Sequence, residues 1–434
     1  MNSTTRRTFI QTSALSALSA GRAWGSNDRI NVAIVGVGGR GQAHIRGYAK
    51  QPDAHIYALC DVDQANLERS LALVKKLTGQ TPKAYKDMRD VFAEKEVNAV
   101  SMPLPNHWHA LATIWACQAG KDVYIEKPAC HDPYEGRQMV AAARKYGRMV
   151  QVGSQGRSAD HKIRAVQLLQ EGIIGQVYMA KGLCFKRRKS IGHTPNEPVP
   201  AGVDWDKFRG PAPMIPFSKN HFLYNWHWFW DTGNGDIGNQ GVHEMDIARW
   251  GLGVGHPRSA VANGGKYVYK DDQETPNTLL SRFDYGDKEL VFEVRGLQTG
   301  TEGELSMTSE GNTVGDLFYG SDGWLSLDGN GYRVFKGDPA KLIQSAKSGN
   351  DSFAAHIANF LSAMRSRKYQ DLHADVDIGR ISADLCHLAN ISYRLGGQLE
   401  NFDPRTERFE NAKANDLAHP PYRAPYVIPN LTGE

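Results

Sequence analysis

The sequence predicts two consecutive domains, a doubly wound parallel α/β domain followed by an α+β domain built on a largely antiparallel open sheet. In the first part of the chain, short apolar runs such as "INVAIVG", "AHIYALCDVD" and "VNAVSMPLP" alternate with helical stretches such as "ALATIWACQAG". Strands of this kind are buried on both faces of a parallel sheet, with right-handed helical crossovers between them. After about residue 157 the strand-like runs are joined by glycine-rich and asparagine-rich turns, which favours antiparallel pairing.

This pattern divides the 434 residues into four segments. Two further apolar runs, "DVYIEKP" and "MVQVGSQ", complete the parallel sheet, so residues 26–155 form the first domain. The runs "GQVYMAKGLCF", "TLLSRFDYG", "KELVFEVRGL", "GELSMTSEG" and "GWLSLDG", with two amphipathic helices around Ile357 and Leu385, form the second domain, residues 156–400. Residues 401–434 are rich in Pro, Asn and Arg and are predicted to be an extended arm lying on the surface or on a neighbouring molecule.

The first 25 residues resemble an export signal of the twin-arginine type. Arg6 and Arg7 follow a threonine and precede Phe9 and Ile10, and a weakly apolar run then extends to Ala20. Proteins with such a signal are exported already folded, so we expect a periplasmic location. A disordered basic leader is the alternative interpretation.

Charge and composition exclude several classes of function. The formal net charge is +4, but Arg6, Arg7 and Arg22 lie in the export segment and the remainder is nearly neutral. Neither a nucleic acid nor an anionic membrane surface is therefore expected as a partner. No run reaches the roughly 18 to 20 apolar residues that span a bilayer. The 5 cysteines are scattered and form no Cys-x-x-Cys pair, so neither a disulfide framework nor a metal site is predicted.

The turn after the first strand, "GVGGRG", fits the pattern G-x-G-x-x-G between an apolar strand and a helix. Gly36 permits the tight turn, Gly38 lets the backbone approach a pyrophosphate, and Gly41 allows the helix to pack closely. The N-terminus of the helix adds partial positive charge. Gly39 and Arg40 therefore also lie where a dinucleotide binds, and the first domain is predicted to be a Rossmann dinucleotide-binding domain.

The end of the second strand carries Asp61, about 20 residues after the last glycine of the turn, where such domains place an acidic residue. A carboxylate there can accept hydrogen bonds from the ribose hydroxyls of NAD and would repel the additional phosphate of NADP. No Lys or Arg follows Asp61 directly. We therefore predict NAD as the cofactor, the alternative being a glycine turn with an Asp that merely caps a helix.

The stretch "YIEKP" ends a predicted buried strand with Glu126, Lys127 and Pro128. Ligands bind at the carboxyl edge of parallel sheets. Lys127 is therefore predicted to face the cofactor site, although lysine is more often a solvated surface residue.

These motifs, together with "PNHWHA" (Pro105 to Ala110), resemble the Gfo/Idh/MocA family, which includes glucose-fructose oxidoreductase and inositol dehydrogenase. "GQVYMA", "DWDKFRGPAP" and "GDLFYGSDGWLSL" lie where that family has its second domain, so the resemblance covers nearly all of the chain after the export segment. It implies an NAD(P)-dependent oxidoreductase acting on sugars or polyols, in which Lys127 contacts both cofactor and substrate. It also implies cofactor contacts from Pro105, Asn106, His109 and Glu126.

The second signature of that family, G-G-G-x-x-x-D-x-G-x-H, matches "GNGDIGNQGVH" at three glycines and at His243, but Asn239 stands where the family has aspartate. The resemblance implies that His243 is a catalytic residue. A neutral imidazole can accept a hydroxyl proton while hydride leaves the same carbon, and the Lys127 ammonium can stabilise the developing alkoxide. Asn239 can orient the imidazole by accepting from its N–H but adds no negative charge. We therefore expect His243 to be a weaker base than in relatives with aspartate.

The preceding segment, "NHFLYNWHWFWDTG", concentrates aromatic side chains. Trp226, His227 and Trp228 are predicted to contact the substrate, because a sugar ring offers an apolar C–H face for stacking. An aromatic core plug explains the segment equally well. Arg157, in "GSQGRS", is also predicted to line the substrate cleft. His107 is not interpreted as a metal ligand, because no set of further ligands is spaced with it.

The export signal bears on the reaction, because free NAD is scarce outside the cytoplasm. An enzyme that released NADH there would soon stop, so we expect a tightly bound cofactor whose hydride is returned before the product leaves. The expected function is hydride transfer between a carbohydrate or polyol carbon and this bound NAD.

Two alternatives remain on the sequence alone. One resembles the NAD-retaining α-N-acetylgalactosaminidases, which oxidise a sugar transiently, eliminate its glycosidic substituent and return the hydride. The other is a non-catalytic protein that binds NAD and sugar. The family resemblance also implies a homo-oligomer, a dimer or tetramer, paired through the open faces of the second sheet.

Overall fold

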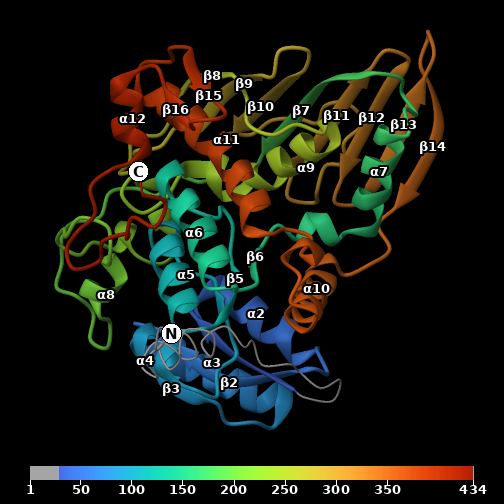
Figure 1. Ribbon diagram of the computed structural model, residues 1–434. Coiled ribbons are helices and arrows are strands. Elements are labelled where there is room, and N and C mark those ends of the chain that lie inside the picture. Colours follow the sequence, from blue (N-terminus) through green and yellow to red (C-terminus); the bar gives the residue numbers. More distant parts are fainter. Residues whose placement is uncertain (1–28, 434) are drawn as a thin grey trace, which may run out of the picture.

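The computed structural model describes residues 29–433 (Figure 1). The predicted export segment, residues 1–25, lies outside the described residues, so the twin-arginine signal stays a prediction. Two sheets and the helices around them make up the described chain. None of the helices within residues 29–433 has the length and apolar character needed to cross a membrane.

The first sheet is parallel and six-stranded, with the order β3-β2-β1-β4-β5-β6. Its central strands are apolar and buried because helices cover both faces. The strand order reverses beside β1, which opens a crevice at the carboxyl ends of the strands. The strands are β1 (Ile30–Val35), β2 (Ala54–Cys60), β3 (Lys83–Tyr85), β4 (Ala99–Met102), β5 (Asp122–Ile125) and β6 (Val150–Val152). The crossover helices are α2 (Gly39–Ala49), α3 (Gln64–Thr78), α4 (Met88–Ala93), α5 (His109–Gln118) and α6 (Pro133–Lys145).

Capping side chains set where several of these helices begin and end. Asp63 accepts a hydrogen bond from Ala65 N at 3.0 Å at the start of α3, and Asp132 accepts one from Glu135 N at 2.9 Å at the start of α6. Helix α3 ends at Gly79, whose φ of +73° lies in the left-handed region that glycine adopts without strain. Both capping aspartates follow strands, so the caps also fix how each strand leads into its helix.

The second sheet has ten strands in the order β14-β13-β12-β11-β7-β10-β9-β8-β15-β16, and only β7 and β10 pair in parallel. The predicted largely antiparallel open sheet is thus confirmed. The strands are β7 (Val177–Phe185), β8 (Ser259–Gly265), β9 (Thr278–Asp284), β10 (Glu289–Arg295), β11 (Thr313–Gly320), β12 (Gly323–Asp328), β13 (Gly331–Lys336), β14 (Lys341–Lys347), β15 (Glu400–Asp403) and β16 (Arg408–Phe409).

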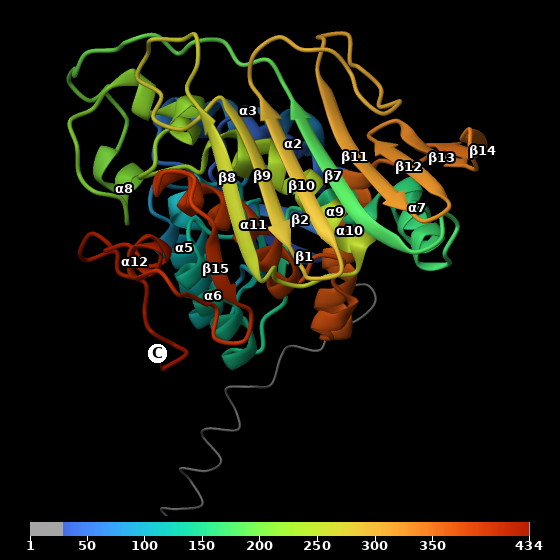
Figure 2. The same cartoon turned by 90° about the horizontal axis from the view of Figure 1, so that it is seen from above.

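Helices from the second half of the chain join the two sheets. Helix α9 (Val242–Leu252) and helix α11 (Val376–Arg394) cover one face of the ten-stranded sheet, and Figure 2 shows the other face without a covering helix among residues 29–433. Helix α10 (Ser352–Ser366) packs instead against α2, where Ile357 and Phe360 enter the core of the first sheet. The remaining helices are α7 (Asp160–Gln170), α8 (Trp205–Arg209) and α12 (Ala412–Ala418).

One predicted strand is not formed. The run "GELSMTSEG" contains only an isolated bridge from Met307 to Thr313. Gly303, Glu304 and Gly311 all have positive φ values, so the backbone turns at both ends of the run instead of extending.

The predicted C-terminal arm, residues 401–434, begins within β15, continues through β16 and α12, and then runs as an extended segment over the first domain. We call residues 420–432 the C-terminal strap. Tyr426 and Ile428 of the strap enter the same apolar core as β4 and β5. Leu431 N donates to Gln138 Oε1 of α6 at 2.6 Å, which fixes the far end of the strap.

Candidate active site

A cavity of about 680 Å³ lies at the carboxyl ends of the parallel strands, between the first sheet and the segments that follow β7. Parallel α/β sheets bind ligands in this position. Among the residues predicted from the sequence, the lining contains Gly36, Gly38, Gly39, Arg40, Asp61, Pro105, Asn106, Glu126, Lys127, Trp226, His227, Asn239 and His243. One cavity therefore brings together the predicted cofactor residues and the predicted catalytic residues.

The glycines of the turn after β1 have separate steric roles. A Cβ at Gly41 would lie 2.2 Å from the carbonyl oxygen of Gly36, so α2 starts as close to β1 as it does only because this residue is glycine. Gly36 has φ +87°, which permits the turn itself. No atom of the described residues lies within 4 Å of a Cβ placed on Gly39, because this residue faces the open cavity at the N-terminus of α2. A pyrophosphate fits there, beside the free N–H groups of the helix.

Asp61 is fixed at the end of β2 by the backbone. Its carboxylate accepts from Val37 N at 2.7 Å and from Asp63 N at 2.9 Å. Burial raises the pKa of this carboxyl to about 6, against the effect of the two N–H donors. At pH 7 the group is mostly ionised and can accept from ribose hydroxyls, so the residues present fit NAD.

Replacement of Asp61 by alanine is expected to weaken NAD binding about 10-fold to 100-fold, since hydrogen bonds to a charged group contribute roughly 1.5–3 kcal/mol. The preference for NAD over NADP should also fall, because the repelling carboxylate is gone. Calorimetric titration of the cofactor-free protein with both dinucleotides measures this. Asp90→Ala, an acid on the exposed side of α4, is the control. Unchanged NAD affinity in Asp61→Ala would contradict the ribose assignment.

The side chain of Glu126 organises the floor of the cavity. It accepts from Arg40 Nε at 2.8 Å and lies 2.9 Å from His44 Nε2. Burial alone would raise the pKa of this carboxyl, but Arg40 and His44 hold it well below its ordinary value. Glu126 is therefore an anion that fixes Arg40 over the start of α2 and lies beside Lys127.

The ammonium of Lys127 points across the cavity and donates to the carbonyl oxygen of Asn239 at 2.6 Å. Burial lowers its pKa, which Glu126 counteracts in part. One ammonium N–H thus joins the end of β5 to the π-helical turn Ile237–Gly241. The other donors of the ammonium remain available to a ligand in the cavity.

His243 lies in the first turn of α9 and lines the same cavity. Burial lowers the pKa of its imidazole well below the ordinary value, and the charge of Lys127 lowers it further. The ring is therefore neutral at pH 7 and able to accept a proton. This is the protonation state that the predicted catalytic role requires.

The expected contact between Asn239 and His243 is not formed within residues 29–433. The Asn239 amide instead donates from Nδ2 to the Tyr224 hydroxyl at 3.0 Å. The cause is the π-helical turn, which presents the Asn239 carbonyl to Lys127 and directs the side chain toward Tyr224. Asn239 therefore belongs to the site through its backbone and through Tyr224.

The aromatic segment divides between the cavity and the protein interior. Trp226 and His227 line the cavity with their rings stacked at 3.6 Å between centroids. Trp228 is only 3% exposed and packs under the Arg188 guanidinium, which leaves it outside the lining. The predicted substrate contact from Trp228 is therefore not brought to the cavity.

Two further predicted residues lie outside the cavity lining. Arg157 is 7% exposed and binds both carboxylate oxygens of Asp246, with contacts of 2.8–3.1 Å. Because the guanidinium of Arg157 is bound in this buried ion pair, it does not reach the cleft. His109 lies with its ring nitrogens 2.6 and 2.8 Å from the carbonyl oxygens of Pro128 and Leu104, so it joins two cavity-lining loops from behind.

The structure also adds lining residues that the sequence does not single out. Phe208 and Tyr224 come from the long segment between β7 and α9, and Tyr426 comes from the C-terminal strap. The segment around α8 is tied to the turn after β2, because Asp204 N donates to Val62 O at 3.0 Å and Gln64 N donates to Gly202 O at 3.1 Å. The only sequence signal for this cover is the concentration of aromatic residues in it.

Family models match most of the chain. A model described as "Oxidoreductase family, NAD-binding Rossmann fold" matches residues 30–154, and one described as "Oxidoreductase family, C-terminal alpha/beta domain" matches residues 159–262 and 320–428. Both belong to the family that the sequence motifs resemble. The NAD-binding domain and the oxidoreductase class are thereby confirmed.

Among curated proteins, the chain is 27% identical over 213 residues to a glycosyl hydrolase family 109 protein of Stenotrophomonas maltophilia. The matched region covers 46% of this chain and 47% of that protein. It is 26% identical over 159 residues to D-glucoside 3-dehydrogenase of Escherichia coli, 36% of this chain and 44% of that protein. The matches thus span about half or less of these relatives' length.

Solved structures share the fold at low sequence identity. The WlbA dehydrogenase from Bordetella pertussis, crystallised with NADH and UDP-GlcNAcA, is 19% identical with a TM-score of 0.62, over 86% of this chain and 99% of that chain. An aldose-aldose oxidoreductase from Caulobacter crescentus is 17% identical with a TM-score of 0.63, over 86% of this chain and all of that chain. The combination of a Rossmann domain with an open antiparallel sheet is common to all three proteins.

Proposed function

The chain belongs to the Gfo/Idh/MocA oxidoreductase family, and from this premise we propose that it transfers hydride between a hydroxyl-bearing carbon of a sugar or polyol and an NAD that stays bound. The observation that carries the proposal is the single cavity in which a dinucleotide site meets Lys127 and His243. The aromatic wall made by Trp226 and His227 suits the C–H face of a sugar ring. Relatives named for glucosides, aldoses and a sugar nucleotide support the same substrate class.

The proposed mechanism assigns a separate task to each of two side chains. Bound NAD supplies the hydride acceptor, held by the glycine turn and Asp61. Neutral His243 accepts the hydroxyl proton of the substrate. The Lys127 ammonium, oriented by the Asn239 carbonyl, donates a hydrogen bond to the oxygen on which negative charge develops.

Retention of the cofactor is supported by how the cavity is covered. Lys207 and Phe208 of the α8 segment line it, together with Trp108 and Tyr426. The Tyr426 ring packs edge-on against Trp108 with centroids 5.4 Å apart. A dinucleotide leaving past these residues would have to displace segments that come from distant parts of the sequence.

The strap is anchored to α8 by ionic contacts. Arg423 Nη1 donates to Asp206 Oδ1 at 2.7 Å, and the Tyr426 hydroxyl donates to Asp206 Oδ2 at 2.9 Å. Arg423 Nε also donates to the Gly210 carbonyl at 2.9 Å. Asp206 is therefore the common anchor through which the strap and the α8 segment hold each other in place.

Loss of this anchor is expected to speed the dissociation of NAD about 10-fold, as Asp206→Ala leaves Arg423 and Tyr426 without their shared acceptor. Arg405→Ala is a matched control in the arm, because Arg405 is exposed and pairs only with Asp403 in the described residues. The measurement is the rate at which bound NADH fluorescence is lost on dilution into an NADH-consuming trap. Equal rates in Asp206→Ala and wild type would remove the strap from cofactor retention.

We also propose that the protein is exported by the twin-arginine route and works in the periplasm, where a retained cofactor lets it turn over without an external NAD pool.

The similarity to glycosyl hydrolase family 109 proteins favours one second candidate function, the redox-neutral cleavage of a glycosidic bond. In that reaction, oxidation of a ring hydroxyl acidifies the adjacent C–H bond and the glycosidic substituent leaves. Water then adds, and the stored hydride returns to the ketone.

One experiment tests retention and the two candidate reactions. The protein is purified from the periplasm and denatured, and the supernatant is assayed for NAD(H). We expect close to one dinucleotide per chain in the supernatant. The native protein should then turn over sugar pairs or glycosides without added NAD. Release of free aglycone with no net oxidation would select the glycosidase reaction. A cofactor-free protein that binds and releases NAD rapidly would contradict retention.

Asn239→Asp is expected to move the acid limb of the pH–rate profile to higher pH by about one unit, because a carboxylate near His243 and Lys127 stabilises their protonated forms and raises the pKa of both groups. The same substitution keeps the backbone carbonyl that orients Lys127. The profile of kcat between pH 5 and 9 measures the shift, with Asn225→Asp in the same aromatic segment as the control. An unchanged acid limb would show that residue 239 does not set the basicity of His243.

We further propose a homo-oligomer, a dimer or tetramer, formed through the uncovered face of the ten-stranded sheet. That face carries Leu280, which is 53% exposed, paired across β9 and β10 with Glu293. Light scattering of the purified protein tests this, and a monomer at micromolar concentration would contradict it.

A further inference from the structure

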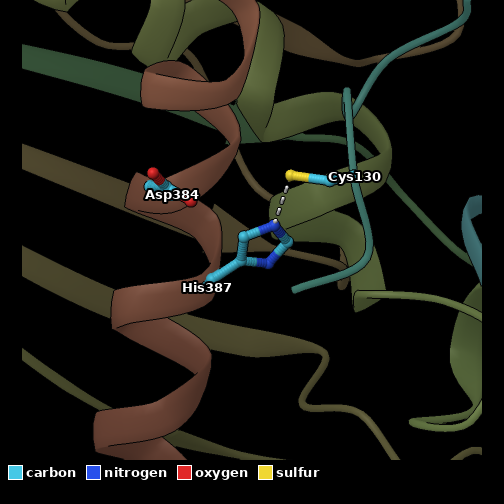
Figure 3. A group of neighbouring side chains, drawn as sticks. All are labelled: Cys130, Asp384 and His387. Carbon is cyan, nitrogen blue, oxygen red and sulfur yellow. Dashed lines mark hydrogen bonds between the residues drawn. The ribbon is translucent and has the colours of Figure 1, made fainter. Parts of the chain in front are cut away.

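Three potential metal ligands meet behind the loop that carries Lys127 (Figure 3). Cys130 comes from this loop after β5, whereas Asp384 and His387 come from successive turns of α11. All three side chains are buried, with exposed fractions of 0%, 1% and 3%. Their ligand atoms all lie within 4.8 Å of one another, although Cys130 is more than 250 positions before Asp384 and His387 in the sequence.

The spacing of the sulfur and nitrogen atoms suits a shared ion. Cys130 Sγ lies 3.6 Å from His387 Nε2. Two ligands with bond lengths of about 2.3 Å to sulfur and about 2.0–2.1 Å to nitrogen lie roughly 3.5 Å apart around a tetrahedral zinc ion. Thiolate, imidazole and carboxylate are also the ligand types that zinc takes in proteins.

Asp384 provides a second, independent observation. Its Oδ2 lies 2.9 Å from His256 Nε2 and 3.5 Å from Arg380, but its buried Oδ1 has no hydrogen-bond partner among residues 29–433. A buried carboxylate oxygen without a donor is costly unless a cation or a water meets it. Figure 3 shows the Asp384 carboxylate beside the imidazole of His387 and across from Cys130.

Buried acidic side chains lie around Cys130. Asp132 and Glu135, at the start of α6, are 3% and 1% exposed and add two carboxyl groups close to Cys130. Arg380 and Arg137 are neighbouring cations, and Glu407 and Asp377 bind Arg380 at 2.8 Å each. A dication near Cys130 would therefore meet acidic side chains on both α6 and α11.

We propose that Cys130, Asp384 and His387 bind a divalent transition-metal ion, with zinc preferred. Binding deprotonates the Cys130 thiol and releases that proton to solvent. A neighbouring cavity of about 270 Å³, which His387 lines, has room for a water as fourth ligand. The ion would join α11 to the loop three residues after Lys127, so it holds the catalytic loop in place without touching the substrate.

The full-length protein, purified without chelators or a histidine tag, is tested by elemental analysis. We expect close to one zinc per chain in wild type and in Cys386→Ser, and about a tenth of that or less in Cys130→Ser and His387→Gln. Cys386 is a matched control because it is buried on the same helix, next to His387, and its thiol contacts the Ile237 carbonyl instead. Zinc bound equally by Cys130→Ser and wild type would overturn the proposal.

A cobalt experiment on the wild-type chain avoids any variant that fails to fold. Protein stripped of metal and loaded with Co²⁺ should show a thiolate-to-cobalt charge-transfer band and a tetrahedral d–d spectrum. In the competing arrangement, without an ion, the Nε2–H of His387 donates to the thiol of Cys130. Wild-type protein that contains no metal and gives no such spectrum with Co²⁺ would establish that arrangement.

Discussion

Lys127→Met should lower kcat by about 10²-fold to 10³-fold, the loss found when one donor to a developing oxyanion is removed. Methionine keeps the length and the apolar stem of lysine but has no charge and no N–H. The ammonium is preset by its 2.6 Å hydrogen bond to the Asn239 carbonyl, so no reorganisation is needed when charge develops. Single-turnover reduction of the bound cofactor, followed by nicotinamide absorbance, measures the chemical step directly. Lys127→Arg should not restore the rate, because a planar fork cannot take the place of a point donor.

Two controls separate this effect from a loss of structure. NAD content per chain should remain near the wild-type value in Lys127→Met, because the glycine turn and Asp61 hold the dinucleotide. Lys83→Met removes an exposed lysine that pairs with Glu94 and should leave kcat unchanged. A Lys127→Met variant as fast as wild type would contradict the catalytic role of Lys127. It would instead favour the alternative that the protein binds NAD and sugar without catalysing a reaction.

The parallel sheet and the positions of Lys127 and His243 could be predicted from the sequence because each depends on local patterns. Buried strands are short apolar runs, and the carboxyl edge of a parallel sheet brings the ends of β1, β2 and β5 together in any such fold. For His243, the glycine-rich turn before it resembles a family motif, and that resemblance implies its role. These features need no knowledge of which distant segments touch.

The errors arise where a distant partner decides the position of a side chain. The sequence predicts Arg157 in the cleft, but Asp246, one helical turn after His243, binds its guanidinium. Trp226 and Trp228 lie in the same 3₁₀ helix, but Trp228 is buried and packs against the distant Arg188. The contribution of Tyr426 depends on a strap that reaches the cavity from the end of the chain. No periodicity in the sequence encodes these contacts.

His243→Asn should lower kcat by about 10²-fold to 10⁴-fold, the usual contribution of a general base. It should also remove the acid limb of the pH–rate profile. The wild-type imidazole has a pKa lowered by burial and by Lys127, and the base must be unprotonated to act. The wild-type rate should therefore stay constant through pH 7 and fall only at a pH well below 6.5. In Lys127→Met the limb should move to higher pH, because the neighbouring positive charge is gone.

The loss of the acid limb in His243→Asn and its move to higher pH in Lys127→Met identify the base more securely than the loss of rate does. A purely structural defect would lower kcat at every pH alike. Glu244 is a competing group, because it follows His243 directly and acts electrostatically on Lys127. Burial raises the pKa of its carboxyl to about 7, and its side chain accepts weakly from Gln240 at 3.3 Å. An acid limb near pH 7 that persists in His243→Asn and disappears in Glu244→Gln would transfer the role of base to Glu244. Loss of the limb in His243→Asn alone would leave the imidazole as the group that takes the hydroxyl proton.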